Sequence, residues 1–351
     1  MLRRPSRVYH AATSGRGGET VSQRTVSILV YAPASAPLYR TFPEELFRQR
    51  QAELGVRITL ARSYDEVREA IAEADVYFGS RLQPEEFRRA RRLRWIHVPS
   101  AGIEKLLHPD LVASDCLLTN SRGCMADAVA DHTLGAIIYF ARGFDLAVAG
   151  QQARRWEPVA QRRMPMELAD LSVGLVGFGE IGRALATRCK ALGMRVFAMR
   201  RQKGVNPCPD LVEAMWGPDD LDRLIDASTF VVLAVPVVSD THHLIGEREL
   251  KRMGPGRFLI NVGRGQLVDE AALLRALREG WIGGAALDVF EQEPLPPESP
   301  LWGQPNLLIT PHIAGQTPRY WERVVHLFFR NLERFLAGEP LERLVDKKRG
   351  Y

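Results

Sequence analysis

Three glycines at fixed spacing constrain this chain more than any other feature of its sequence. The segment 177–182 reads GFGEIG, and it lies between an apolar run over 171–176 and a helical pattern over 181–192. In a strand–turn–helix unit, the first glycine allows a tight turn, the second lets the backbone approach a pyrophosphate, and the third lets the helix pack on the sheet. The helix N-terminus then offers unpaired N–H groups to the anion. The segment therefore predicts a dinucleotide-binding site.

The residues after the next predicted strand, over 195–199, indicate which dinucleotide binds. NAD enzymes usually place an acidic residue about 20 positions after the glycines, where it accepts a hydrogen bond from the ribose 2′-hydroxyl. This chain has Arg200 and Arg201 there. Two guanidinium groups suit a 2′-phosphate and offer the hydroxyl no acceptor. We therefore favour NADP(H) as the cofactor, with NAD(H) as the alternative.

Composition argues against several other classes of protein. The chain of 351 residues is 46% hydrophobic and 25% charged, which is typical of a globular enzyme. No apolar stretch approaches the ~20 residues of a membrane span. The net charge of +5 is dispersed, without the zinc-ligand spacing or long basic helix of a nucleic-acid-binding protein. The cysteines show no C-x-x-C spacing, so we expect no metal site, no disulfide framework and a cytoplasmic location.

The first 24 residues differ in composition from the rest. They carry arginines with serine, threonine and glycine between them, and Glu19 is their single acid. This composition resembles a transit peptide. A disordered extension, or a start codon assigned upstream of the true one, fits it as well, and we favour an extension over 1–24 that precedes the fold.

Short apolar runs alternate with amphipathic runs from residue 25 onward, which predicts α/β structure with parallel sheets. The pattern contains two doubly wound sets, and a long helical segment over 126–142 leads into the second. A final helix over 317–336 follows the last strand of the second sheet, so we expect it to cross back onto the first set. We predict a discontinuous flavodoxin-like substrate domain over 25–122 and 316–346, with a Rossmann cofactor domain over 123–315 inserted into it.

Three candidate catalytic side chains follow predicted strands of the second set, at the sheet edge where ligands bind. They are Arg264, Glu293 and His312. A guanidinium can hold the carboxylate and carbonyl of a 2-oxo acid. An imidazole can donate a proton to the carbonyl oxygen as hydride arrives, and a carboxylate on its far nitrogen would fix the tautomer. The set suits hydride transfer between a nicotinamide and a 2-oxo acid.

Each of the three residues also has an ordinary interpretation when taken alone. Arg264 lies between glycines and fits a surface turn, His312 follows a proline and fits a turn as well, and Glu293 fits a solvated loop. Their shared position after successive strands, downstream of the glycine segment, favours the catalytic interpretation.

The second half of the sequence resembles the D-isomer-specific 2-hydroxyacid dehydrogenase family. The matching motifs read VGLVGFGEIG over 173–182, INVGRG over 260–265, and ALDVFEQEPL over 286–295. A further motif over 299–315 ends in TPHIAG. Looser matches lie at 93–102 and 118–123. In that family the Arg, Glu and His of these motifs form the catalytic triad, which implies this role for Arg264, Glu293 and His312. The family's carboxylate directly precedes a proline, which selects Glu293 over Glu291.

The resemblance also implies residues that bind the cofactor and the substrate. Backbone N–H groups of the turn at Ser100, Ala101 and Gly102 would bind the substrate carboxylate together with Arg264, and Asp288 would reach the nicotinamide amide. With the glycine segment included, the expected cofactor contacts are Gly177, Phe178, Gly179, Glu180, Ile181, Gly182, Arg200, Arg201, Val235, Pro236, Thr241, Val262, Gly263, Asp288 and Gly315.

The closing segment 345–351, VDKKRGY, and the paired arginines look like the NADPH-using glyoxylate/hydroxypyruvate reductase branch. We therefore expect reduction of a small 2-oxo acid to the D-2-hydroxy acid. The alternatives are an NAD-dependent D-2-hydroxyacid dehydrogenase of the phosphoglycerate type and a non-catalytic, dinucleotide-sensing, corepressor-like protein. The family dimerises through its cofactor domain, which implies a homodimer with the 126–142 region at the interface. We expect no membrane or nucleic-acid partner.

Four further aromatic or imidazole side chains are assigned no role in the chemistry. Trp156 and Trp302 are expected to pack at the domain boundary. His242 and His243 are expected to be solvated in a loop.

Overall fold

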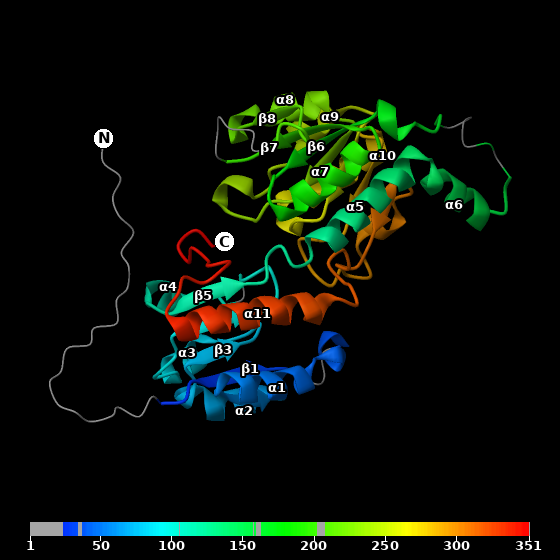
Figure 1. Cartoon of the computed structure of the whole chain (residues 1–351). Coiled ribbons are helices and arrows are strands. Elements are labelled where there is room, and N and C mark those ends of the chain that lie inside the picture. Colours follow the sequence, from blue (N-terminus) through cyan, green and yellow to red (C-terminus); the bar gives the residue numbers. More distant parts are fainter. Residues whose placement is uncertain are drawn as a thin grey trace, which may run out of the picture.

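The computed structural model describes residues 24–350 apart from 34–36, 105, 157, 159–162 and 202–207. The predicted N-terminal extension falls outside the described residues except for its last position, so it stays a prediction. Within the described part of the chain, a five-stranded and a seven-stranded sheet are present, and all of their strand pairs are parallel (Figure 1). The predicted α/β class with two doubly wound sheets is confirmed.

The first sheet has the strand order β2-β1-β3-β4-β5, which is the flavodoxin-like order. Its central strands are buried on both faces, as continuous apolar runs in parallel sheets usually are, whereas the edge strand β2 is partly exposed. Its strands are β1 Ser27–Tyr31, β2 Arg57–Ala61, β3 Val76–Phe78, β4 Trp95–Val98 and β5 Leu117–Asn120, and the helices of this part of the chain are α1 Glu44–Leu54, α2 Tyr64–Ala70, α3 Pro84–Arg89 and α4 Pro109–Ala113.

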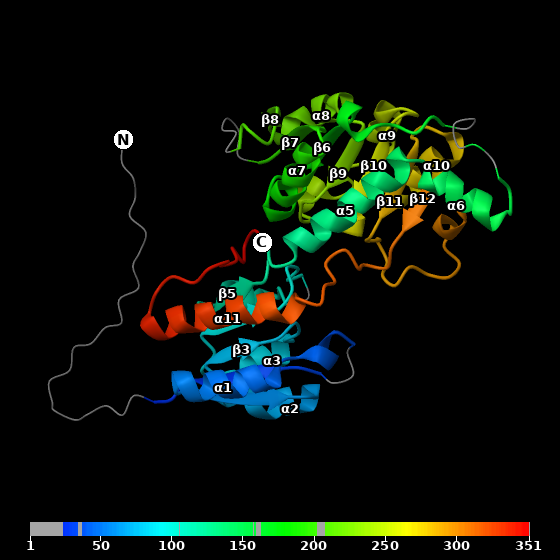
Figure 2. The ribbon, with the colours of Figure 1, turned by 45° about the vertical axis from the view of Figure 1, so that its right-hand side comes forward.

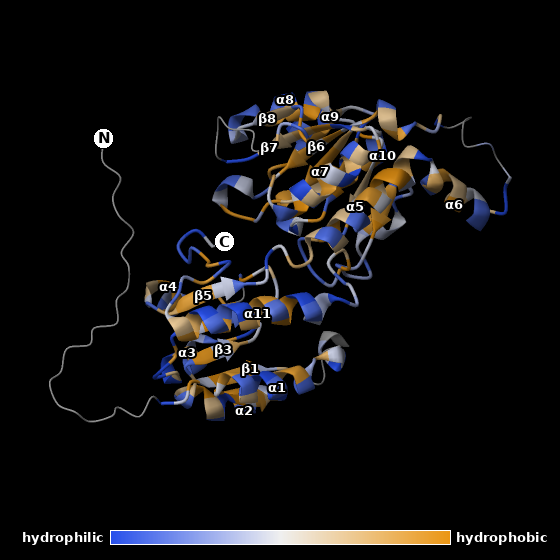
Figure 3. Cartoon of the chain, viewed as in Figure 1, coloured by the Kyte–Doolittle hydropathy of each residue, from blue (hydrophilic) through white to orange (hydrophobic). Residues whose placement is uncertain are grey.

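The second sheet has the order β12-β11-β10-β9-β6-β7-β8, a Rossmann arrangement whose strand order reverses between β6 and β9 (Figure 2). Its strands are β6 Ser172–Val176, β7 Arg195–Met199, β8 Ala214–Trp216, β9 Phe230–Leu233, β10 Phe258–Asn261, β11 Gly284–Leu287 and β12 Leu307–Ile309. The helices that accompany it are α5 Ala126–Ala141, α6 Phe144–Gln152, α7 Glu180–Ala191, α8 Leu221–Ala227, α9 Glu247–Met253 and α10 Glu270–Glu279. Hydrophobic residues are concentrated in the strands of both sheets (Figure 3).

The last helix, α11 Tyr320–Ala337, packs on the first sheet although it follows the second along the chain (Figure 1). Its apolar residues recur at helical spacing and form one stripe. Trp321, Val324 and Phe328 belong to the same buried cluster as Phe47 and Phe78. This packing supports the predicted discontinuous substrate domain, whose exact bounds stay a prediction.

The helical segment expected over 126–142 is followed by a second helix that the sequence pattern did not predict. Helix α5 ends at Ala141, Gly143 takes a left-handed conformation with φ 68°, and α6 begins at Phe144. Phe140 of α5 stacks on Phe258 in the core of the second sheet, with a ring-centroid distance of 5.1 Å. No single helix in the described ranges is long and apolar enough to cross a membrane, and α5 with α6 reach that length and composition only as a pair bent by 71°.

Candidate functional site

The glycine segment forms the turn from β6 into α7 that its spacing predicts. Gly177 has φ +106°, and a Cβ there would lie 2.6 Å from the carbonyl oxygen of Ala234, so a side chain is excluded. A Cβ at Gly182 would overlap the carbonyl oxygen of Gly177. At Gly179, by contrast, no atom lies within 4 Å of a Cβ position. Open space therefore borders the N-terminus of α7, which fits the pyrophosphate of a dinucleotide.

The loop after β9 lies beside this turn, at the point where the strand order reverses. A Cβ at Gly177 would come within 2.7 Å of Val235 Cγ1. The Thr241 hydroxyl donates to the Pro236 carbonyl at 2.8 Å and accepts from Val238 N at 2.8 Å, so it fixes the shape of the loop. Val235, Pro236 and Thr241 thus lie at the edge where dinucleotides bind in such sheets. Their contacts with the cofactor stay a prediction.

The two predicted phosphate-binding arginines follow the end of β7. The backbone N–H of Arg200 donates to the carbonyl of Trp216 in the neighbouring strand β8 at 3.0 Å. Arg200 is half-buried and Arg201 is exposed. Both therefore lie at the same sheet edge as the glycine turn, one strand away from it.

His312 and Glu293 form the pair expected from the sequence. His312 Nδ1 lies 2.7 Å from Glu293 Oε2, and Glu293 Oε1 accepts from the backbone N–H of Phe290 at 3.0 Å. An ionised carboxylate only accepts hydrogen bonds, so Nδ1 of His312 carries the proton of this bond. The imidazole is 54% exposed, which leaves Nε2 as the ring nitrogen for exchange with a substrate.

Asp288 holds the loop that carries His312. Its carboxylate is buried, with Oδ1 accepting from Thr310 Oγ1 at 2.7 Å and from Ile313 N at 2.9 Å, and Oδ2 accepting from Ala314 N at 3.0 Å. The backbone N–H of His312 donates to the Asp288 carbonyl at 2.9 Å. Asp288 therefore orients the proposed proton donor through the backbone, and its expected contact with nicotinamide stays a prediction.

Arg264 extends from a loop that Asn261 braces at the end of β10. Asn261 is fully buried, donates to the Arg264 carbonyl at 2.8 Å and accepts from Gly263 N at 3.1 Å. The guanidinium donates from Nη1 to the Gly263 carbonyl at 2.8 Å and from Nε to Glu104 Oε1 at 3.0 Å. Glu104 lies in the loop after the first sheet's β4, so Arg264 reaches across to the other part of the molecule.

The turn at 100–102 is the other expected substrate-binding element. Ser100 Oγ donates to the Gly102 carbonyl at 2.9 Å, and Asn120 Nδ2 donates to the Ala101 carbonyl at 2.6 Å. A Cβ at Gly102 would overlap Arg264 Nη2. The predicted carboxylate-binding turn and the predicted guanidinium are therefore adjacent.

The remaining expected cofactor residues lie between these parts of the site. A Cβ at Gly263 would lie 3.0 Å from the carbonyl oxygen of Val235, which places the Arg264 loop beside the β9 loop. Val262 is buried. Gly315 follows the His312 loop, with Met125 within 3.6 Å of its Cβ position.

Sequence reasoning missed two residues that shape the site. Glu104 is the ionic partner of Arg264, and Asn120 anchors the turn at Ala101. A polar residue at the end of a buried strand was the available signal for Asn120. Nothing local marked Glu104, because its partner lies 160 positions away.

The expectation for the two tryptophans was wrong. Trp156 does not pack at a boundary, since it is fully exposed, and Trp302 is 52% exposed. His242 and His243 are exposed in a turn, as expected, and His243 Nε2 also lies 2.9 Å from Glu291 Oε1.

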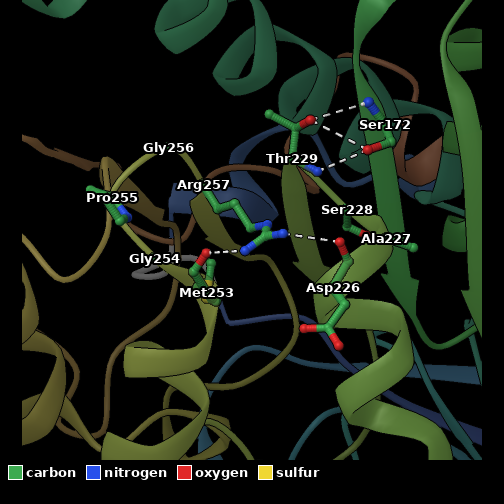
Figure 4. Close-up of a pocket in the computed structure, with 10 residues that line it drawn as sticks. All are labelled: Ser172, Asp226, Ala227, Ser228, Thr229, Met253, Gly254, Pro255, Gly256 and Arg257. Atoms are coloured by element: carbon green, nitrogen blue, oxygen red, sulfur yellow. Dashed lines mark hydrogen bonds between the residues drawn. The ribbon is translucent and has the colours of Figure 1, made fainter.

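A cavity of about 330 Å³ lies at the opposite end of the second sheet, where β6, β9 and β10 begin (Figure 4). Arg257 spans it and donates to the carbonyls of Asp226 at 3.0 Å and of Met253. These bonds cap the ends of α8 and α9, which indicates a structural role. Among the residues that the structure describes, no group of three or more His, Cys, Asp or Glu side chains is arranged to hold a metal.

Comparison with known proteins agrees with this geometry. The family model described as D-isomer specific 2-hydroxyacid dehydrogenase, NAD binding domain, matches residues 134–314. The glyoxylate reductase of Thermofilum pendens is 36% identical over 274 residues, covering 76% of this chain and 79% of the relative. That of Thermococcus gammatolerans is 36% identical over 273 residues, covering 76% and 80%.

Solved structures give the same result. A D-isomer specific 2-hydroxyacid dehydrogenase from Xanthobacter autotrophicus, in complex with NADPH and MES, is 30% identical with a TM-score of 0.79, covering 93% of this chain and 100% of the other. An NADPH-dependent glyoxylate/hydroxypyruvate reductase from Sinorhizobium meliloti, in complex with NADP and sulfate, is 26% identical with a TM-score of 0.77, covering 93% and 100%. The chain is therefore a member of the D-isomer specific 2-hydroxyacid dehydrogenase family and an NAD(P)-dependent oxidoreductase.

Proposed function

We propose that the protein reduces a small 2-oxo acid of the glyoxylate or hydroxypyruvate kind to the D-2-hydroxy acid, with NADPH as the reductant. The observation that carries the proposal is the convergence of three groups. Arg264 adjoins the Gly102 turn and follows β10, while Glu293 and His312, which pair with each other, follow β11 and β12, the next two strands of the same sheet. The names of the relatives, which include glyoxylate reductases, support the substrate class.

The proposed roles follow from the atoms that remain available. A bound nicotinamide dinucleotide supplies the hydride. Arg264 and the backbone N–H groups of the 100–102 turn hold the substrate carboxylate and polarise its carbonyl. His312 donates a proton from Nε2 to the carbonyl oxygen, and Glu293 keeps the ring oriented through Nδ1.

The direct test is turnover by the purified full-length protein. We expect NADPH to be consumed with glyoxylate, hydroxypyruvate or pyruvate, and the product to be recognised by a D-specific assay. Absence of turnover with every short 2-oxo acid would contradict the proposal. Cofactor binding without turnover, together with a protein partner, would favour the corepressor-like alternative.

The preference for NADP(H) is proposed from Arg200 and Arg201 at the end of β7. Two related structures are described with NADPH or NADP, which supports it. We expect a higher kcat/KM with NADPH than with NADH, and a shift of about tenfold or more toward NADH in Arg200→Asp, since a charge-assisted contact to phosphate is lost. Arg195→Asp at the other end of β7 is the matched control and should leave the ratio unchanged. An unchanged ratio in Arg200→Asp would overturn the assignment.

We also propose a homodimer, because exposed apolar side chains gather on α6 and the segment after it. Phe144 is 49% exposed, Val148 40% and Met164 69%, and Trp156 is fully exposed. Phe144 and Val148 are one helical turn apart and share a face. Large apolar side chains exposed on one helix face are typical of interfaces. Light scattering should give a dimer mass that falls in Phe144→Ser with Trp156→Ser, and not in the control Leu336→Ser.

A further inference from the structure

The ion pair of Glu104 and Arg264 borders the turn that is proposed to bind the substrate carboxylate. Arg264 Nε donates to Glu104 Oε1 at 3.0 Å. The other carboxylate oxygen, Oε2, lies 2.6 Å from the Cβ position of Gly102, which Arg264 Nη2 also reaches. A carboxylate of the protein and its guanidinium partner thus face the same turn.

The hydrogen bonds of Arg264 leave a defined part of the guanidinium for a ligand. The group has five N–H donors. One, on Nε, goes to Glu104, and one, on Nη1, goes to the Gly263 carbonyl. These two bonds fix the plane of the guanidinium, and Nη2 is its nitrogen that lies against Gly102. Glu104 therefore directs the Nη2 donors toward the substrate.

The charge of Glu104 is as important as its geometry. Burial alone would raise the pKa of Glu104, but the Arg264 guanidinium and hydrogen bonds from backbone N–H groups together outweigh burial and hold the pKa below its usual value. The carboxylate is therefore ionised at neutral pH and offsets the positive charge of Arg264. One substrate carboxylate can still be bound by N–H donors, whereas a second negative group would be repelled by Glu104.

We propose that Glu104 is a positioning residue for Arg264 and that its carboxylate makes the site select monoanionic 2-oxo acids over dianionic ones. The inference rests on the proposed function, because it takes this turn as the substrate site. It separates the protein from enzymes whose substrates carry a second carboxylate or a phosphate.

The test compares oxamate, a monoanion, with oxalate, a dianion of nearly the same size. Calorimetry on the NADP-loaded full-length protein measures both dissociation constants. Wild type should prefer oxamate, and Glu104→Gln should move the ratio about tenfold toward oxalate, which corresponds to about 1.4 kcal/mol. Glu104→Asp keeps the charge, so it should keep the preference for oxamate.

Turnover gives the second readout. The ratio of kcat/KM for hydroxypyruvate to that for 2-oxoglutarate should fall about tenfold in Glu104→Gln, while KM for hydroxypyruvate rises more than kcat falls. The matched control is Glu45→Gln on α1, since Glu45 also pairs with an arginine, Arg48, at 2.9 Å. It should change neither ratio.

The outcomes separate the two proposals. A ratio that is unchanged in Glu104→Gln, in a protein that reduces short 2-oxo acids, overturns the role of Glu104 and leaves the proposed function standing. Failure of wild type to reduce any short 2-oxo acid overturns the proposed function, and the oxamate-to-oxalate ratio still decides whether Glu104 selects by charge.

Discussion

The two sides of the candidate site are held in different ways. On the side of the second sheet, His312 is tied to Glu293 and Asp288, which follow a neighbouring strand of the same sheet. On the other side, Arg264 is tied to Glu104, which belongs to the loop after a strand of the first sheet. The imidazole is therefore oriented by contacts within one sheet, whereas the direction of the guanidinium depends on the local Gly263 carbonyl and also on how the two sheets are placed. Substitutions should affect the two sides differently.

The largest effect is expected for substitution of His312, whose contacts lie within one sheet. His312→Ala removes the proposed proton donor, and we expect kcat to fall about 10³-fold, within the range for general acid catalysis. Cofactor binding, followed by nicotinamide fluorescence, should change little because the glycine turn is untouched. His326→Ala on α11, which alters an exposed histidine, is the control. A His312→Ala enzyme that keeps the full rate would remove the assigned role.

A smaller effect is expected for substitution of Arg264, whose ion pair joins the two parts of the molecule. Arg264→Lys keeps the charge, but an ammonium lacks the planar fork that serves Glu104, the Gly263 carbonyl and the turn together. We expect kcat/KM for glyoxylate to fall about 10²-fold, mainly through KM. Arg275→Lys, at an exposed ion pair with Glu247, is the control. Wild-type kinetics in Arg264→Lys would show that charge alone suffices.

A second histidine shows how strongly the setting decides what an imidazole does. His97 of β4 is completely buried between the hydroxyls of Thr119 and Ser121, at 2.8 and 3.1 Å. Burial lowers its pKa to about 3. The unfolded value is about 6.5, so the unfolded chain gains this proton first as the pH falls. The stability that His97 contributes is complete above about pH 6.5 and is lost as the pH falls toward 3.

Between pH 7 and pH 5 this loss should amount to about 2 kcal/mol in the free energy of unfolding. Urea titrations at both pH values measure it. His97→Gln cannot bind the proton, so its free energy of unfolding should fall by about 2 kcal/mol less than that of wild type over the same interval. Equal pH dependence in the two proteins would contradict the account of His97.

The smallest effect is expected for the hydrogen bond by which α11 anchors the chain just before the 100–102 turn. Tyr320, the first residue of α11, donates its hydroxyl to the Pro99 carbonyl at 2.8 Å. Tyr320→Phe should lower the free energy of unfolding by about 1 kcal/mol, the usual net value of such a bond. In Tyr320→Phe, KM for glyoxylate should rise by less than it rises in Arg264→Lys. A KM effect as large as that of Arg264→Lys would mean that the turn, rather than the guanidinium, dominates substrate binding.

The sequence was sufficient where the physical cause is local. Gly177 and Gly182 are required by overlap with backbone atoms of their own turn, and their spacing is visible in the chain. The His312–Glu293 pair was predictable because its members follow successive strands of one sheet, whose carboxyl ends share an edge.

What the sequence did not reveal depends on distant or weak determinants. The bond from Glu104 to Arg264 needs the placement of two sheets, which no spacing encodes. Strand β8 is a short, half-buried edge strand, so its apolar signal is weak. Helix α6 leaves Phe144 and Val148 exposed, and its apolar pattern therefore does not point to a core of its own.

The position of α11 in the chain has a consequence for biosynthesis. The aromatic cluster that joins Trp95 of the first sheet to Phe47 of α1 is completed by residues 321–332. The ribosome has therefore translated the strands of both sheets before that cluster acquires its partner, whereas the strands and helices of the second sheet emerge earlier and can fold first. A nascent chain stalled before residue 320 should expose an aromatic surface that chaperones bind, and release of the last helix should end that binding.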